Sequence, residues 1–170
     1  RFLQNCLSTG PSLAGMKLVI DGSNGAASQI APALFKIMNS TVKTIFCTPD
    51  GININDDCGS QHPGTLARRV VAENADLGLA FDGDADRLIA VDENGVTANG
   101  DVLMAIFAKH LKDNDKLKNN TVVSTVMANL GFRRAMQRLG IDVEETAVGD
   151  RYVYEGMRRV KAGLGGEQSG

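Results

Sequence analysis

The sequence predicts an α/β fold: two consecutive βα-type domains with mixed, mostly parallel sheets flanked by helices. Two observations lead to this prediction. Short apolar runs alternate with segments of helical periodicity, which is the pattern of βα units. A polar stretch at residues 113–120 interrupts the alternation and predicts a domain boundary. We therefore expect a first domain over residues 1–112 and a second over residues 113–170.

In the first domain, the expected strand at residues 15–21 ends in the turn Gly22-Ser23-Asn24-Gly25, and a helix follows to about residue 38. This turn favours a simple tight connection, with a phosphate cradle at the helix N-terminus as the alternative. The remaining expected elements are a strand at 42–47, a helix at 63–74, strands at 76–81 and 88–91, a hairpin turn at 93–95 and a helix at 100–112.

In the second domain, the same reasoning predicts two further βα units. Their strands are expected at 121–126 and 141–147, and their helices at 130–139 and 150–160. The chain begins without Met and ends in a glycine-rich loop. We therefore expect a piece of a longer protein, cut at both ends, with the sheet of the second domain incomplete.

Composition narrows the class of protein. Hydrophobic residues make up 43% and charged residues 22%, which is ordinary for a globular chain and not for a disordered one. A net charge of -2 without a basic stripe argues against a nucleic-acid partner. No apolar run approaches the roughly 20 residues of a membrane span. Cys6, Cys47 and Cys58 are odd in number and lack CxxC spacing, which favours a reducing compartment and predicts a cytoplasmic protein.

The strongest local signal is Asp82-Gly83-Asp84-Ala85-Asp86-Arg87, here named the carboxylate loop. It lies between two expected strands. At a separation of ~4 Å, each pair of carboxylates repels by about 4 kcal/mol at an effective dielectric constant near 20, unless a cation lies among them. Oxygen ligands favour Mg²⁺ or Ca²⁺ over zinc. The following Arg87 adds the guanidinium that a transferring phosphoryl group needs.

Three other interpretations of this loop compete. An EF-hand calcium loop is rejected, because it needs Gly where Arg87 stands and helices where strands are expected. A phosphatase that uses Asp82 as its nucleophile stays open, as does a solvated turn that is charged by chance.

Several motifs in order carry a family resemblance. The carboxylate loop resembles the metal loop of the α-D-phosphohexomutase superfamily, and Gly166-Glu167-Gln168-Ser169-Gly170 resembles its sugar-recognition loop. Residues 148–153 resemble the segment that precedes this sugar loop. The segments 53–55 and 58–63, together with Gln168, resemble the bacterial phosphoglucosamine mutase branch. The resemblance covers essentially the whole chain.

The resemblance implies a role for each matching residue. It implies that Asp82, Asp84 and Asp86 bind Mg²⁺, and that Arg87 is catalytic beside the transferring phosphoryl group. It implies substrate binding by a second set of residues in the expected second domain: Glu167, Ser169, Asp150 and Arg151. For Asp150 and Arg151, a purely structural place at a helix N-terminus, with Asp150 as the cap, is the alternative.

The resemblance also implies an isomerase of four domains. It would interconvert glucosamine 6-phosphate and glucosamine 1-phosphate through a phosphoserine and a hexose 1,6-bisphosphate. The phosphoserine loop of domain 1 and the phosphate loop of domain 4 do not occur in this sequence. We therefore expect these domains as partners, and no turnover by this chain alone. Phosphomannomutase or phosphoglucomutase activity, a phosphatase and a metal-binding structural module stay open, as does a homodimer of the parent.

Overall fold

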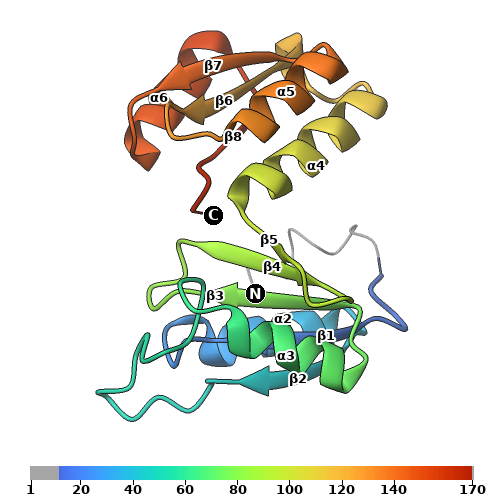
Figure 1. Ribbon diagram of the computed structural model, residues 1–170, viewed down its shortest axis with the longest axis vertical. Helices are drawn as coiled ribbons and strands as arrows, with labels where there is room; N and C mark the ends of the chain where they lie inside the picture. The colour runs from blue at the N-terminus through green and yellow to red at the C-terminus, as the bar shows by residue number, and fades with distance from the viewer. Residues whose placement is uncertain (1–11, 170) are drawn as a thin grey trace. The chain divides into compact units, whose positions relative to one another are not determined.

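The computed structural model describes residues 12–169, so Cys6 and Gly170 lie outside the described range. The α/β class is confirmed (Figure 1), and the chain divides into two compact units between Thr97 and Ala98. The predicted boundary after residue 112 is therefore wrong. Helix α4 (Gly100–Asp113) belongs to the second unit because it packs against helix α5 and strand β8 of that unit.

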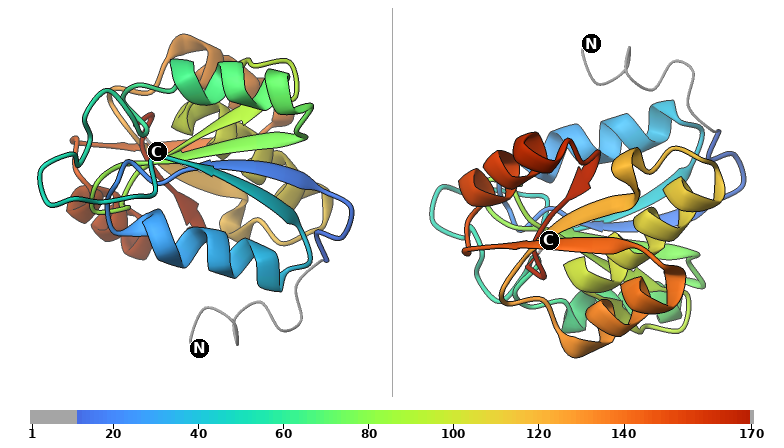
Figure 2. Two further views of the ribbon diagram at one scale, coloured as in Figure 1. Left: turned by 90° about the horizontal axis from the view of Figure 1, so that it is seen from below. Right: turned by 90° about the horizontal axis from the view of Figure 1, so that it is seen from above.

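The first unit is a five-stranded sheet with one helix on each face. Its strands follow the order β2-β1-β3-β4-β5; β1 runs parallel to β2 and β3, and β4 is antiparallel to β3. Helices α2 and α3 cover opposite faces of this sheet (Figure 2, left). The bounds are β1 Lys17–Asp21, α2 Ala27–Ile37, β2 Thr41–Ile45, α3 Gly64–Glu73, β3 Leu77–Phe81, β4 Leu88–Asp92 and β5 Thr97–Ala98.

The two faces of this sheet are packed by alternate residues of its central strand. Val19 joins the cluster that includes Leu66 and Val70 of α3, whereas Ile20 joins the cluster of Ala27 and Ala31 in α2. Neighbouring residues of a strand point to opposite faces, so one short apolar run supplies both cores. Burial of each such large side chain contributes roughly 1.5–3 kcal/mol.

The second unit is a three-stranded parallel sheet in the order β7-β6-β8. Helices α4 and α5 cover one face and α6 covers the other (Figure 2, right). Its further bounds are η1 Lys118–Asn120, β6 Thr121–Thr125, α5 Leu130–Leu139, β7 Asp142–Thr146, α6 Asp150–Val160 and β8 Leu164–Gly165. Strand β8 was not predicted, because two residues are too few to show a period. No helix within residues 12–169 has the length and apolar character needed to cross a membrane.

Each sheet gathers its functional candidates at one edge. The loops that follow parallel strands start at the same edge, and open α/β sheets bind ligands there. In the first unit these are the loops after β1, β2 and β3, the last of which is the carboxylate loop. In the second unit they are the loops after β6, β7 and β8.

Candidate functional site

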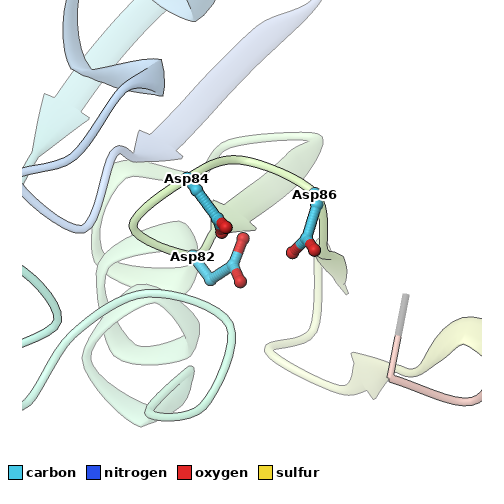
Figure 3. Close-up of side chains that lie close together, drawn as sticks. All are labelled: Asp82, Asp84 and Asp86. Atoms are coloured by element: carbon cyan, nitrogen blue, oxygen red, sulfur yellow. The ribbon is translucent and has the colours of Figure 1, made fainter. Parts of the chain in front are cut away.

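The three aspartates of the carboxylate loop come together. One carboxylate oxygen from each of Asp82, Asp84 and Asp86 lies within 4.8 Å of the others. The close-up shows these carboxylates directed toward a common space (Figure 3). Asp82 is buried, with 7% of its surface exposed, whereas Asp84 and Asp86 are exposed. Three convergent oxygen donors with access from solvent fit a hard divalent cation.

Short-range hydrogen bonds shape this loop around Asp82. The carbonyl of Asp82 accepts from the N–H of Ala85 at 3.1 Å, and its carboxylate accepts from the N–H of Arg87 at 3.1 Å. Ala85 adopts a left-handed backbone with φ 65°. The loop joins the antiparallel strands β3 and β4, which confirms the expected strand flanks and the rejection of an EF-hand.

Electrostatics in the loop leave negative charge for a cation to neutralise. A side-chain hydrogen bond with Asp82, followed by partial loss of hydration and by repulsion from Asp82 and Asp84, raises the pKa of the Asp86 carboxyl. Arg87 opposes this rise. Its Nε lies 3.8 Å from Asp82 Oδ2 and 3.7 Å from Asp86 Oδ1. One guanidinium therefore faces a group of three carboxylates, and its own side chain stays 46% exposed.

Two neighbouring loops are in direct contact with Gly83. The N–H of Ala26 donates to the Gly83 carbonyl at 2.8 Å. A Cβ added at Gly25 would lie 2.3 Å from that carbonyl oxygen, and one added at Gly83 would lie 2.7 Å from Asn55 Nδ2. Glycine is therefore required at position 25, where the contact is with backbone, and this close approach fixes where the carboxylate loop begins.

Sequence reasoning missed Asp21, a buried carboxylate at the end of β1. It is 0% exposed and accepts hydrogen bonds from the N–H groups of Ser23 at 2.8 Å and Gly59 at 3.0 Å. Burial raises the pKa of the Asp21 carboxyl, and the two backbone hydrogen bonds oppose this rise. The available signal was a charged residue that ends an apolar strand directly before a Gly-Ser-Asn-Gly turn.

The turn at residues 22–25 is not a phosphate cradle. Its N–H groups already have protein acceptors: Gly22 donates to the carbonyl of Ile45, Ser23 to Asp21, Asn24 to the carbonyl of Phe46, and Gly25 to the carbonyl of Gly22. A phosphate would have to displace these bonds, so the tight-turn interpretation holds.

In the second unit, Glu167 connects the two segments that sequence analysis assigned to the sugar. Its Oε1 accepts a hydrogen bond from the N–H of Gly149 at 2.9 Å, immediately before α6. The carbonyl of Gln168 accepts from the N–H of Gly100 at 3.0 Å, at the start of α4. Glu167 and Ser169 are half-buried. Two helix N-termini thus hold the loop at 166–169.

Asp150 and Arg151 lie on the first turn of α6, close to Glu167 through Gly149. Gly149, and not Asp150, occupies the N-cap position, so the predicted capping role of Asp150 is wrong. Asp150 instead accepts a hydrogen bond from the N–H of Arg151 at 2.7 Å. The side chain of Arg151 pairs with Glu155 at 3.0 Å, and both Asp150 and Arg151 are exposed.

Comparison with known proteins agrees with this arrangement. The family described as phosphoglucomutase/phosphomannomutase, alpha/beta/alpha domain II, matches residues 2–95, and its domain III matches residues 99–170. The phosphoglucosamine mutase of Staphylococcus aureus strain JH9 is 54% identical over 156 residues, which cover 92% of this chain. The chain spans about a third of the length of such relatives, since the match covers 35% of that enzyme.

Solved structures share the fold. A phosphoglucomutase/phosphomannomutase family protein from Burkholderia thailandensis is 25% identical, with a TM-score of 0.84 over 99% of this chain and 37% of that one. The N-acetylphosphoglucosamine mutase of Aspergillus fumigatus is 22% identical, with a TM-score of 0.75 over 99% of this chain and 34% of that one. The boundary between the two matched domains also falls where the structure divides. The chain therefore belongs to the phosphoglucomutase/phosphomannomutase family, of which it comprises the second and third α/β/α domains.

Proposed function

We propose that the full-length parent of this chain is a magnesium-dependent phosphosugar mutase, and that this chain supplies its metal loop and its sugar loop. The observation that carries the proposal is the convergence of Asp82, Asp84 and Asp86 beside Arg87. Phosphoryl transfer depends mainly on positioning and on neutralising charge at the phosphate oxygens. A carboxylate trio with an adjacent guanidinium is suited to both tasks.

Each residue of the carboxylate loop has a distinct part in this proposal. Asp82, Asp84 and Asp86 would hold Mg²⁺, which supplies charge neutralisation at the phosphoryl oxygens when bound. Arg87 stabilises the transferring phosphoryl group. Its guanidinium is half-exposed and is held only at 3.7–3.8 Å by its acidic neighbours, so it is free to reorient toward a phosphate. Asp82 is both buried and bonded to the backbone of Arg87, which fixes the start of the loop.

Sugar recognition is assigned to the second unit. Glu167 and Ser169 bind sugar hydroxyls, since a carboxylate and a hydroxyl together suit a pair of neighbouring hydroxyl groups. Oε1 of Glu167 already accepts from Gly149, which orients the carboxylate and leaves Oε2 for substrate. Asp150 and Arg151 lie next to Gly149 and contact the substrate from the first turn of α6.

We assign glucosamine 6-phosphate and glucosamine 1-phosphate as the substrate pair. Support comes from the 54% identity to an enzyme named phosphoglucosamine mutase. The route is that of the family: a phosphoserine from domain 1 and a hexose 1,6-bisphosphate intermediate, with domain 4 as the remaining partner. This chain alone is expected not to turn over. The free thiols of Cys47 and Cys58 support a cytoplasmic location.

³¹P NMR of the full-length parent tests this function. The sample contains glucosamine 6-phosphate, Mg²⁺ and a trace of hexose 1,6-bisphosphate. We expect a growing 1-phosphate signal that requires the bisphosphate. Free inorganic phosphate would instead indicate a phosphatase that uses Asp82. Turnover of only mannose or glucose phosphates would keep the mechanism and change the substrate, and no reaction with any of them would contradict the proposal.

A further inference from the structure

Asp21 lies where three loops of the first unit begin. It is the last residue of β1, the strand between β2 and β3, and its partners across the sheet are Ile45 and Ala80. Its carboxylate is fully buried. Burial of a carboxylate is costly unless hydrogen bonds compensate, and here each oxygen accepts one backbone N–H. Asp21 therefore contributes hydrogen bonds to two loops, and not apolar packing, at this end of the sheet.

The two hydrogen bonds of Asp21 tie together two separate loops. Oδ1 holds Ser23 in the turn after β1, and Oδ2 holds Gly59 in the loop before α3. The same two loops are joined a second time, because the N–H of Asn55 donates to the carbonyl of Ser23 at 3.0 Å. We name residues 22–26 and 53–60 together the loop clamp.

The loops on either side donate hydrogen bonds to the backbone before and after Asp82. From one loop, the N–H of Ala26 donates to the Gly83 carbonyl at 2.8 Å. From the other, the N–H of Ser60 donates to the Phe81 carbonyl at 3.0 Å. The residues immediately before and after the first aspartate of the carboxylate loop are therefore held by the two loops that Asp21 joins.

We propose that Asp21 is a positioning residue for the carboxylate loop. Its hydrogen bonds hold the two segments of the loop clamp together, and these segments hold the backbone beside Asp82 so that the three aspartates converge. The inference rests on the proposed function, since it assigns the metal and the transfer step to that loop. Residues outside the immediate ligands that orient a metal site change its affinity by about ten- to a hundredfold when they are replaced.

The test uses the full-length parent protein and Mn²⁺, whose binding is followed directly by electron paramagnetic resonance. Asp21→Asn keeps the shape of the side chain but replaces one acceptor oxygen with an NH₂ group, so one of the two backbone bonds is lost. We expect the Mn²⁺ dissociation constant to rise about tenfold and kcat to fall. KM for the sugar phosphate should stay unchanged, because the proposed sugar contacts lie in the second unit.

Ser40→Ala is the matched control. Ser40 is also buried in the first unit, and its hydroxyl donates to the Phe35 carbonyl at 2.7 Å. It lies just before β2, at the amino ends of the parallel strands and away from the carboxylate loop. This variant should lose stability without a change in Mn²⁺ affinity. If Asp21→Asn shows the Mn²⁺ affinity and kcat of Ser40→Ala, the role of Asp21 is only structural and the inference is wrong.

A second variant covers a failure of Asp21→Asn to fold. Asn24 lies in the loop clamp, where its Oδ1 accepts from Thr48 and its Nδ2 donates to the Asn53 carbonyl. Asn24→Ala should also raise the Mn²⁺ dissociation constant, by a smaller factor than Asp21→Asn does; an unchanged constant would overturn the inference. A wild-type parent that binds Mn²⁺ but isomerises nothing would contradict the proposed function alone, and one that binds no Mn²⁺ would contradict both.

Discussion

The carboxylate loop of the first unit and the loop at 166–169 of the second unit lie at corresponding edges of their sheets but are fixed differently. Two adjacent loops and a buried carboxylate, Asp21, hold the first through contacts that leave room only for glycine. The second is held by hydrogen bonds from Gly166 to the Val123 carbonyl of β6, from Gly100 to the Gln168 carbonyl, and from Gly149 to the Glu167 side chain. The loop proposed to bind the ion is thus fixed by close backbone packing, whereas the side chains proposed to bind the sugar, Glu167 and Ser169, are only half-buried.

This difference has a physical reason. Convergent carboxylates repel one another, so their backbone must be held against that repulsion before a cation arrives. A sugar presents hydroxyl groups that must bind in two orientations if its phosphates exchange places. Half-buried side chains such as Glu167 and Ser169 can meet that need more easily than a clamped loop.

The largest expected effect is from Asp84→Ala in the parent enzyme. We expect kcat to fall about a thousandfold, because the metal supplies several kcal/mol of charge stabilisation in the transition state. Asp84 is exposed and is repelled by its neighbouring carboxylates, so in metal-free buffer the free energy of unfolding should not fall. Steady-state kinetics and urea unfolding measure the two quantities. Glu93→Ala, at an exposed carboxylate in the hairpin, should leave both unchanged; a fully active Asp84→Ala enzyme would refute the metal assignment.

Arg87→Lys separates charge from geometry within the same loop. Lysine keeps the positive charge but loses the planar donor pair that suits phosphate. We expect kcat to fall about a hundredfold, the range seen when one charge-stabilising donor is removed, while Mn²⁺ affinity stays within a factor of about two. Arg68→Lys, at a surface site on α3, is the control. Equal kcat values for the Arg87→Lys and wild-type enzymes would show that Arg87 is not a catalytic residue.

Glu167→Gln tests the other side of the comparison. Glutamine retains an oxygen that can accept from Gly149, so the loop should stay in place while the charged partner of the sugar is lost. We expect KM for the sugar phosphate to rise about tenfold with Mn²⁺ affinity unchanged. Glu144→Gln on β7 should have no such effect. A loss of kcat alone, without any change in KM, would argue against sugar binding by Glu167.

The last prediction concerns the pH dependence of stability and not activity. Burial, with smaller contributions from Asp21, Asp56 and Asp57, raises the pKa of the Cys58 thiol from 9.0 to about 11. The pKa of the Cys58 thiol is higher in the folded state than in the unfolded state. The stabilisation that the buried neutral thiol gives to the fold is therefore fully present below pH 9 and is lost as the pH rises through 11. The difference in unfolding free energy between wild type and Cys58→Ala should therefore shrink over this range, by at most about 2 kcal/mol. A difference independent of pH would contradict the prediction. The second unit contains no cysteine and contributes no such titration.

The sequence predicted the carboxylate loop and both βα patterns because these are local signals. Asp82, Asp84 and Asp86 occur within five residues, and helix 150–160 was predicted with its observed bounds. The proposed role of Asp21 could not be predicted, since one of its two partners, Gly59, is 38 residues away in the sequence and reaches it only in the folded unit. The domain boundary was misplaced because the polar stretch after α4 resembles a linker, whereas α4 packs within the second unit.

A crystal of the full-length parent soaked in Mn²⁺ shows whether the three aspartates bind the metal, because anomalous scattering locates the ion without reference to turnover. We expect one peak about 2 Å from an oxygen of each of Asp82, Asp84 and Asp86, the spacing of a hard octahedral cation. An ion bound elsewhere in the active site, with these three carboxylates left in water, would contradict it.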